Sequence, residues 1–232
     1  MIRRQTLSET LWPDDPLEVE MASLWARNVT SQALDWMWRA FDAMQREHLI
    51  RVDLTKPMEQ IERDLTRIHF VQVLRLFGAE TQGFASFVPF YEYPEMESRP
   101  TPPGRPPAYD FAFVFSDNQR WVWPLEAKMI ETTGSLAEYL KDVNGKFVAG
   151  IAAPIVGEGA MIGYLLVNDT QTVFANLESR LGQILHFVPE FSQRPHRTSH
   201  HLRVSASEIR LHHLLMSCVQ STASTIDPPS EL

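Results

Sequence analysis

Two stretches rich in aromatic residues, YDFAFVFS (109–116) and RWVWPLEAK (120–128), constrain the fold of this chain most. Side chains alternate between the two faces of a β-strand, and most residues on both faces of these stretches are apolar. The short polar turn between them predicts a hairpin that is buried in a sheet. Asp110, Glu126 and Lys128 nevertheless lie within it, and a buried charge is costly unless it is paired or bound to a metal.

The spacing of these three residues indicates where they meet. Glu126 and Lys128 are two residues apart and therefore share one face of their strand, and Asp110 is the polar exception on the partner strand. Carboxylate oxygens in this arrangement suit Mg²⁺ or Mn²⁺. The alternative is an exposed ion pair on an edge strand, which Pro124 favours because proline prefers edges.

The remaining elements follow from periodicity and from start and stop signals. Gly78 is the predicted stop of the second helix, and Ser135 with Glu138 forms a capping box for the third. Their order predicts a mixed α/β sheet with helices on its faces. The predicted elements are helices over 31–48 and 58–77, a strand with Pro89 over 84–93, a proline-rich loop over 94–108, a helix from Ser135, a strand over 161–167, a helix capped by Asn168 or Asp169, and a hairpin from HLRVS (201–205) and IRLHHLLM (209–216).

An aspartate on one strand followed by E-x-K on the next resembles the PD-(D/E)XK nuclease superfamily, with Tyr109 in place of the proline before Asp110. The resemblance implies a restriction-endonuclease-like fold, with a mixed central β-sheet flanked by helices and an amino-terminal helical extension. The implied division is a helical extension over 1–55, a nuclease-like domain over 56–218 and a flexible tail over 219–232.

Two further segments are similar to patterns of this superfamily. IERDLTRIH (61–69) resembles the E-x-x-L-T helix that precedes the sheet, and places Glu62 as the assisting acid, with Glu59 as an alternative. EYLKDVNGKFVAG (138–150) resembles Y-x-x-x-G-x-x-R-F-x-x-G of bacterial nucleases, with Val143 for a glycine and Lys146 for the arginine. The residues that fit this pattern and its continuation are Tyr139, Lys146, Phe147, Gly150, Met161, Gly163 and Tyr164.

The resemblance implies a metal-dependent endonuclease in which Asp110, Glu126 and the carbonyl of Ala127 bind Mg²⁺ or Mn²⁺. Lys128 would position water or stabilise charge, and Glu62 would assist. DNA rather than RNA is the implied substrate, and bacterial antiviral defence is the implied setting, with a homo-oligomer or a defence-system subunit as partner. The alternative is a catalytically inactive subunit of the same fold that binds nucleic acid or a partner protein.

The net charge of −8 argues against a phosphate-rich partner, but the charge is uneven. Residues 180–213 hold five arginines against two glutamates and six of the eight histidines. We therefore expect nucleic acid to approach over this segment. The predicted contacts are Lys146, Tyr139, Arg194, Arg197 and Arg203. The histidines indicate either core and hairpin pairing or, as the alternative, a zinc site.

Cys218 is the only cysteine, which excludes an internal disulfide and a cysteine-based zinc cluster. No apolar run approaches the ~20 residues that span a bilayer, and the first residues lack the apolar region of a secretory signal. The expectation is a cytoplasmic protein without a membrane partner.

Overall fold

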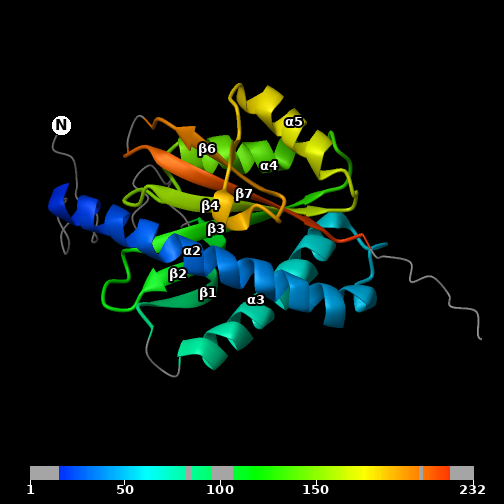
Figure 1. The fold of residues 1–232 in the computed structure, drawn as a ribbon, viewed down its shortest axis with the longest axis horizontal. Helices are drawn as coiled ribbons and strands as arrows, with labels where there is room; N and C mark the ends of the chain where they lie inside the picture. The colour runs from blue at the N-terminus through cyan, green and yellow to red at the C-terminus, as the bar shows by residue number, and fades with distance from the viewer. Residues whose placement is uncertain (1–15, 82–84, 96–106, 204–205, 220–232) are drawn as a thin grey trace, which may run out of the picture.

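The computed structural model describes residues 16–81, 85–95, 107–203 and 206–219, and it contains a seven-stranded mixed sheet (Figure 1). The strand order is β1-β2-β3-β4-β7-β6-β5, with β3, β4 and β7 parallel and the other neighbours antiparallel. The strands are β1 (Phe87–Pro94), β2 (Ala108–Phe115), β3 (Val122–Ile130), β4 (Glu158–Leu165), β5 (His186–Phe187), β6 (His196–His201) and β7 (Ile209–Ser217).

Helices cover both faces of this sheet, as the mixed α/β prediction requires. Trp36 of α2 (Pro16–Glu47) packs against Phe87 and Phe113, and His69 of α3 (Met58–Thr81) packs against Phe111 and Tyr164, so these two helices share one face. The helical segments are α2 (Pro16–Glu47), η1 (Leu49–Arg51), α3 (Met58–Thr81), α4 (Ala137–Asp142), the π-helical turn η2 (Val143–Val148), α5 (Thr170–Leu181) and η3 (Pro189–Phe191).

The first helix is about twice as long as the sequence predicted, because its buried stripe begins with small residues. Ala22, Ala26 and Ala33 are fully buried and continue the stripe of larger residues toward the amino terminus. At Thr30, the side-chain hydroxyl accepts a hydrogen bond of 3.0 Å from the indole of Trp123 in β3. This helix therefore belongs to the same core as the sheet.

Two predicted helix signals are wrong. Helix α3 continues through Gly78 to Thr81, because the backbone at Gly78 is open to solvent and nothing forces a left-handed turn there. Helix α4 begins after Leu136 without a side-chain cap, and the hydroxyl of Ser135 pairs with that of Thr132 instead. Asp169 is confirmed as an N-cap, since its carboxylate accepts from the backbone N–H of Thr172.

The closing hairpin lies earlier in the chain than predicted. Strand β6 covers 196–201 and pairs with β7, whereas the prediction placed its strand at 201–205. Leu202 is exposed and Arg203 turns inward directly after the strand. Residues 204–205 of the predicted strand lie outside the described residues.

The two strand prolines, Pro89 and Pro124, differ in whether their strand lies at the edge of the sheet. Pro89 lies in the edge strand β1, as predicted, but Pro124 lies in the internal strand β3, opposite Ala112. The alternative of an exposed pair on an edge strand is therefore wrong for Glu126, which is 1% exposed.

Most of the predicted proline-rich loop and the tail from 220 onward lie outside the described residues. In the described part of the chain, no helix combines the length and apolar character needed to cross a membrane.

Candidate active site

The site begins where the pairing between β2 and β3 ends. Their last paired residues are Phe111 and Leu125, and one more step of this register places Asp110 opposite Glu126, on the same face. Asp110 Oδ2 accepts a hydrogen bond of 2.7 Å from the backbone N–H of Ala127. A side-chain carboxylate thus takes the place of a backbone carbonyl, and the two acids are held at the point where the strands part.

Lys128 is fixed by groups from three elements. Its Nζ donates to the carbonyl of Ala127 at 2.9 Å and to Glu62 Oε1 at 3.1 Å, and it lies 3.4 Å from Asp142 Oδ2. The other oxygen of Glu62 accepts from the backbone N–H of Met129 at 2.8 Å. Glu62 therefore ties α3 to β3 and orients the lysine at the same time.

A second lysine approaches from the helix that follows β3. Lys146 Nζ lies 2.7 Å from Glu126 Oε2 and 3.1 Å from Asp142 Oδ2. Asp142 is the last residue of α4, and the chain continues as the wider π-helical turn η2, which carries Lys146. Such turns are frequent at functional sites because they redirect side chains.

We call these six residues the carboxylate–lysine cluster: Glu62, Asp110, Glu126, Asp142, Lys128 and Lys146. With all six ionised, four carboxylates face two ammonium groups and leave two negative charges in excess. Oε1 of Glu126 is buried and has no hydrogen-bond partner among the described residues. The cluster thus has more carboxylates than lysines and one acceptor oxygen without a donor in the described part of the chain. In a purely structural ion pair, by contrast, the charges balance and the hydrogen bonds are complete.

Burial and mutual repulsion shift the pKa values in this cluster. Burial and then the charge of Asp110 raise the pKa of Glu126 from 4.5 to about 8. Burial also raises the pKa of Asp110 and of Glu62, against the lowering effect of Lys128. Burial alone would lower the pKa of Lys128 and of Lys146, but the surrounding carboxylates together outweigh it and raise both. The lysines stay charged, and Glu126 holds a proton at neutral pH unless another cation arrives.

The oxygen atoms of the cluster suit a hard divalent cation. Asp110 and Glu126 supply carboxylate oxygens, and the carbonyl of Ala127 comes from the residue directly after Glu126. Within the described ranges, no group of three or more His, Cys, Asp or Glu side chains is arranged to hold a metal by itself. A site of two carboxylates, one carbonyl and water needs no such group, because Mg²⁺ keeps several waters.

The structure does not place Tyr139 on a nucleic-acid-facing surface. The residue is 1% exposed, and its hydroxyl forms a hydrogen bond of 2.8 Å with His213 Nδ1. Tyr139 lies in α4 and packs close to Gly163 of β4. A side chain larger than that of glycine at position 163 would collide with the side chains around it. The expected contact of Tyr139 with nucleic acid is therefore replaced by a core role.

Arg203 is also committed to the interior. Its guanidinium is buried and donates to the backbone carbonyls of Ala152 at 3.2 Å, Ala153 at 2.9 Å and Val156 at 3.1 Å. Ala153 has a φ of 52°, an unusual conformation for a residue with a side chain, so this loop needs such an anchor. Arg203 is not available to phosphates, contrary to the prediction.

The two other predicted arginines do not form one surface. Arg194 makes a two-pronged ion pair with Asp42 of α2, at 2.8 and 2.6 Å. Arg197 lies over the ring of Phe174 of α5 and 4.0 Å from the ring centre of Phe187. Helices α2 and α5 lie on opposite faces of the sheet, so the basic segment 180–213 does not present a continuous basic face.

The sequence analysis missed the role of Asp142, although a signal for it exists. Asp142 and Lys146 are four residues apart, which places them on one side of a helix. Together with Lys128 they join α4 and η2 to β3. The i, i+4 spacing identifies the pair, but only the fold shows that it faces two strand residues.

The buried histidines of this segment, His196, His212 and His213, form hydrogen-bonded chains in the core, as the core alternative predicted, whereas His186 and His200 are exposed. In the one that we call the histidine chain, Trp38 Nε1 contacts His196 Nδ1 at 3.4 Å, and His196 Nε2 contacts His212 Nδ1 at 3.0 Å. His212 Nε2 then contacts Glu158 at 3.2 Å, and Arg210 pairs with the same carboxylate. Every ring nitrogen already has a partner, so this chain does not require the zinc ion of the alternative interpretation.

Comparison with protein families, with curated proteins and with solved structures gives no match to this chain.

Proposed function

We propose that the chain is a divalent-metal-dependent nuclease with a restriction-endonuclease-like arrangement. The order α3, β1, β2, β3, α4, β4, with β3 antiparallel to β2 and parallel to β4, supports this interpretation. One observation carries the proposal: Glu126 stands beside Asp110 with a buried oxygen that has no partner among the described residues, in a cluster that carries excess negative charge once Glu126 is ionised. A divalent cation would balance that charge and use that oxygen.

The donor set fits Mg²⁺ or Mn²⁺, with Asp110, Glu126 and the Ala127 carbonyl as the groups that would hold it. When bound, such an ion acts as a Lewis acid and supplies a nucleophilic water at neutral pH. Glu126 must lose its proton first, because burial raises its pKa to about 8. Asp110 is held in place by the Ala127 N–H, so little reorganisation is needed at this ligand.

The lysines would act on the phosphodiester. Lys128 is oriented by Glu62 and the Ala127 carbonyl, and its raised pKa keeps it a cation that donates to a water or to a phosphate oxygen. Lys146 pairs with Glu126. If the Glu126 carboxylate held the divalent cation instead, Lys146 would be free to contact the phosphate. A single charge on a flexible stem suits such a change of partner.

A cytoplasmic location is part of this proposal. DNA as the substrate and a setting in bacterial antiviral defence, with or without a partner subunit, are part of it by resemblance alone. They rest on the E-x-K strand, on the E-x-x-L-T helix with Glu62 and on the segment with Lys146.

The test is cleavage of supercoiled plasmid and of a short RNA in titrations of Mg²⁺ and Mn²⁺. We expect Glu126→Gln and Lys128→Met to lower the rate by ~100-fold or more, since the first removes a ligand of the metal ion and the second a cation that acts on the reacting phosphate. Glu138→Gln is the matched control, because Glu138 is an exposed acid of α4 that pairs with Lys141 and not with the cluster. Its rate should equal that of the unaltered protein.

Thermal unfolding of each variant separates loss of chemistry from loss of fold. Cleavage by a well-folded Glu126→Gln protein at the original rate would contradict the proposal. The absence of cleavage on both substrates, together with the absence of Mn²⁺ binding, would favour the catalytically inactive subunit instead.

A further inference from the structure

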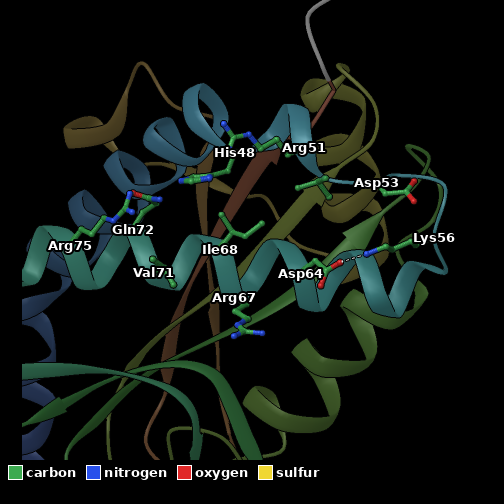
Figure 2. Close-up of a pocket in the computed structure, with 11 residues that line it drawn as sticks. His48, Arg51, Asp53, Lys56, Asp64, Arg67, Ile68, Val71, Gln72 and Arg75 are labelled. Atoms are coloured by element: carbon green, nitrogen blue, oxygen red, sulfur yellow. Dashed lines mark hydrogen bonds and ion pairs between the residues drawn. The ribbon is translucent and has the colours of Figure 1, made fainter.

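A cavity of about 460 Å³ lies between the carboxyl-terminal end of α2, the turn η1 and the middle of α3 (Figure 2). None of the six cluster residues lines it. Residues from these segments line it, and some of their polar atoms have no partner among the described residues. Its lining includes His48, Arg51, Val52, Ile68, Gln72 and Arg75.

Gln72 carries the strongest indication of a ligand. The residue is only 3% exposed, and its Oε1 accepts a hydrogen bond of 3.1 Å from Arg75 Nη1. A guanidinium can only donate, so this contact fixes which end of the amide is the oxygen. The buried Nε2 then has no hydrogen-bond partner among the described residues. A buried N–H donor without an acceptor is costly, and it calls for an acceptor in the cavity.

The other unsatisfied groups of the cavity are basic. His48 Nε2 is buried without a hydrogen bond, 3.5 Å from the carboxylate of Glu47, and no interaction is seen between the Arg51 side chain and any described residue. The two acids of the lining are already engaged. Asp53 accepts from the N–H and hydroxyl of Thr55, and Asp64 pairs with Lys56 at 2.9 Å, as Figure 2 shows for the latter. The unused polar chemistry therefore favours an anion.

Apolar side chains complete the lining. Val52, Ile68 and Val71 offer aliphatic surface between the basic groups, and Figure 2 shows Ile68 in the centre of the lining. The volume falls within the range of small-molecule sites, about 300–1,000 Å³. A ligand with an anionic end and an organic body matches this combination better than a simple ion does.

We propose that this cavity binds the phosphate group of a small phosphorylated organic molecule, of about the size of a mononucleotide. A phosphate monoester offers three acceptor oxygens to several donors at once, and guanidinium groups match its geometry. Gln72 Nε2, His48 Nε2 and Arg51 supply the donors, and the aliphatic lining contacts the organic body.

The proposal is tested by calorimetric titration with inorganic phosphate, adenosine monophosphate and adenosine, in buffer with a chelator so that no metal takes part. We expect adenosine monophosphate to bind more tightly than phosphate, and adenosine not to bind. Gln72→Leu and Arg51→Gln should each weaken the binding by ~10-fold or more, because each removes one donor to the phosphate. Arg180→Gln, an exposed arginine of α5, is the matched control and should bind normally.

Gln72→Leu offers a second readout. It removes a buried unpaired donor, so the ligand-free variant should melt at a higher temperature than the unaltered protein while losing the ligand. Glu126→Gln should bind the nucleotide normally, which separates this cavity from the carboxylate–lysine cluster. Binding that is absent for both phosphate and nucleotide, unchanged in Gln72→Leu, or abolished in Glu126→Gln would overturn the proposal.

Discussion

Two buried polar groups lie on the same sheet and differ in how completely they are satisfied. In the histidine chain, the indole of Trp38 can only donate, so His196 must accept at Nδ1 and donate at Nε2 to His212. His212 then donates to Glu158, whose charge is balanced by Arg210. Every group has a partner of the correct kind, and burial holds both imidazoles neutral by lowering their pKa values.

The carboxylate–lysine cluster does not close in this way. Its carboxylates outnumber its lysines, and one oxygen of Glu126 has no hydrogen-bond partner among the described residues. Buried polar networks that are fully satisfied stabilise one structure, whereas partly satisfied ones cost stability unless something else binds. Whether each polar group has a hydrogen-bond partner therefore distinguishes the structural network from the candidate active site.

Matched substitutions in the two groups should have opposite effects on stability. We expect Glu158→Gln to lower the free energy of unfolding by about 1–3 kcal/mol, because Arg210 and His212 lose a charged acceptor. Glu126→Gln should not destabilise the metal-free protein, since Lys146 keeps Asp142 as a partner and the repulsion with Asp110 disappears. Urea unfolding in the presence of a chelator measures both.

The pH dependence sharpens this contrast. The folded pKa of Glu126 lies above its ordinary value of 4.5, so the unaltered protein loses stability as pH rises from about 4.5 through about 8. The advantage of Glu126→Gln should grow over the same window and then level off. Equal losses of stability for Glu126→Gln and Glu158→Gln at every pH would contradict the distinction between the two groups.

The affinity for a metal ion should depend on the protonation of the same residue, Glu126. A divalent cation at Asp110 and Glu126 displaces the proton of Glu126, whose pKa is about 8. We expect Mn²⁺ affinity to rise ~10-fold per pH unit between pH 6 and 8 and to level off above, because one proton is released per ion. Calorimetry in two buffers of different ionisation enthalpy counts that proton.

Glu126→Gln has no proton to release and serves as the control for this measurement. Residual Mn²⁺ binding to that variant should not depend on pH in this window. If affinity in the unaltered protein is also flat from pH 6 to 8, Glu126 is not a ligand of the bound ion.

Alternation along two strands was enough to predict that Asp110, Glu126 and Lys128 lie together, and helix spacing placed Glu62 and Lys146 on suitable faces. These relations are local, because they depend on the period of a single element and on one short turn. The mixed α/β sheet followed from the order of the elements. Its restriction-endonuclease-like identity stays a proposal.

Relations between distant segments could not be predicted in the same way. Arg203 looks like a surface arginine in the sequence, and only the loop at Ala153 shows why it is buried. The amino-terminal half of α2 was missed because alanines gave its buried stripe little contrast. The cavity beside Gln72 depends on the packing of η1 against α3, and the sequence pattern of neither segment predicts it.

The smallest expected effect concerns Tyr139, which the sequence analysis assigned to nucleic acid. Its hydroxyl is hydrogen-bonded to His213, whose other nitrogen contacts Ser199 Oγ at 2.8 Å, so it belongs to a satisfied network like the histidine chain. We expect Tyr139→Phe to lower the free energy of unfolding by about 1 kcal/mol, the value of one buried hydrogen bond. Nucleic-acid affinity, measured by fluorescence anisotropy with a labelled oligonucleotide, should not change, whereas Lys146→Met should weaken it. A Tyr139→Phe protein that keeps its stability and loses nucleic-acid affinity would return this tyrosine to the binding surface and would remove it from the group of structural polar residues.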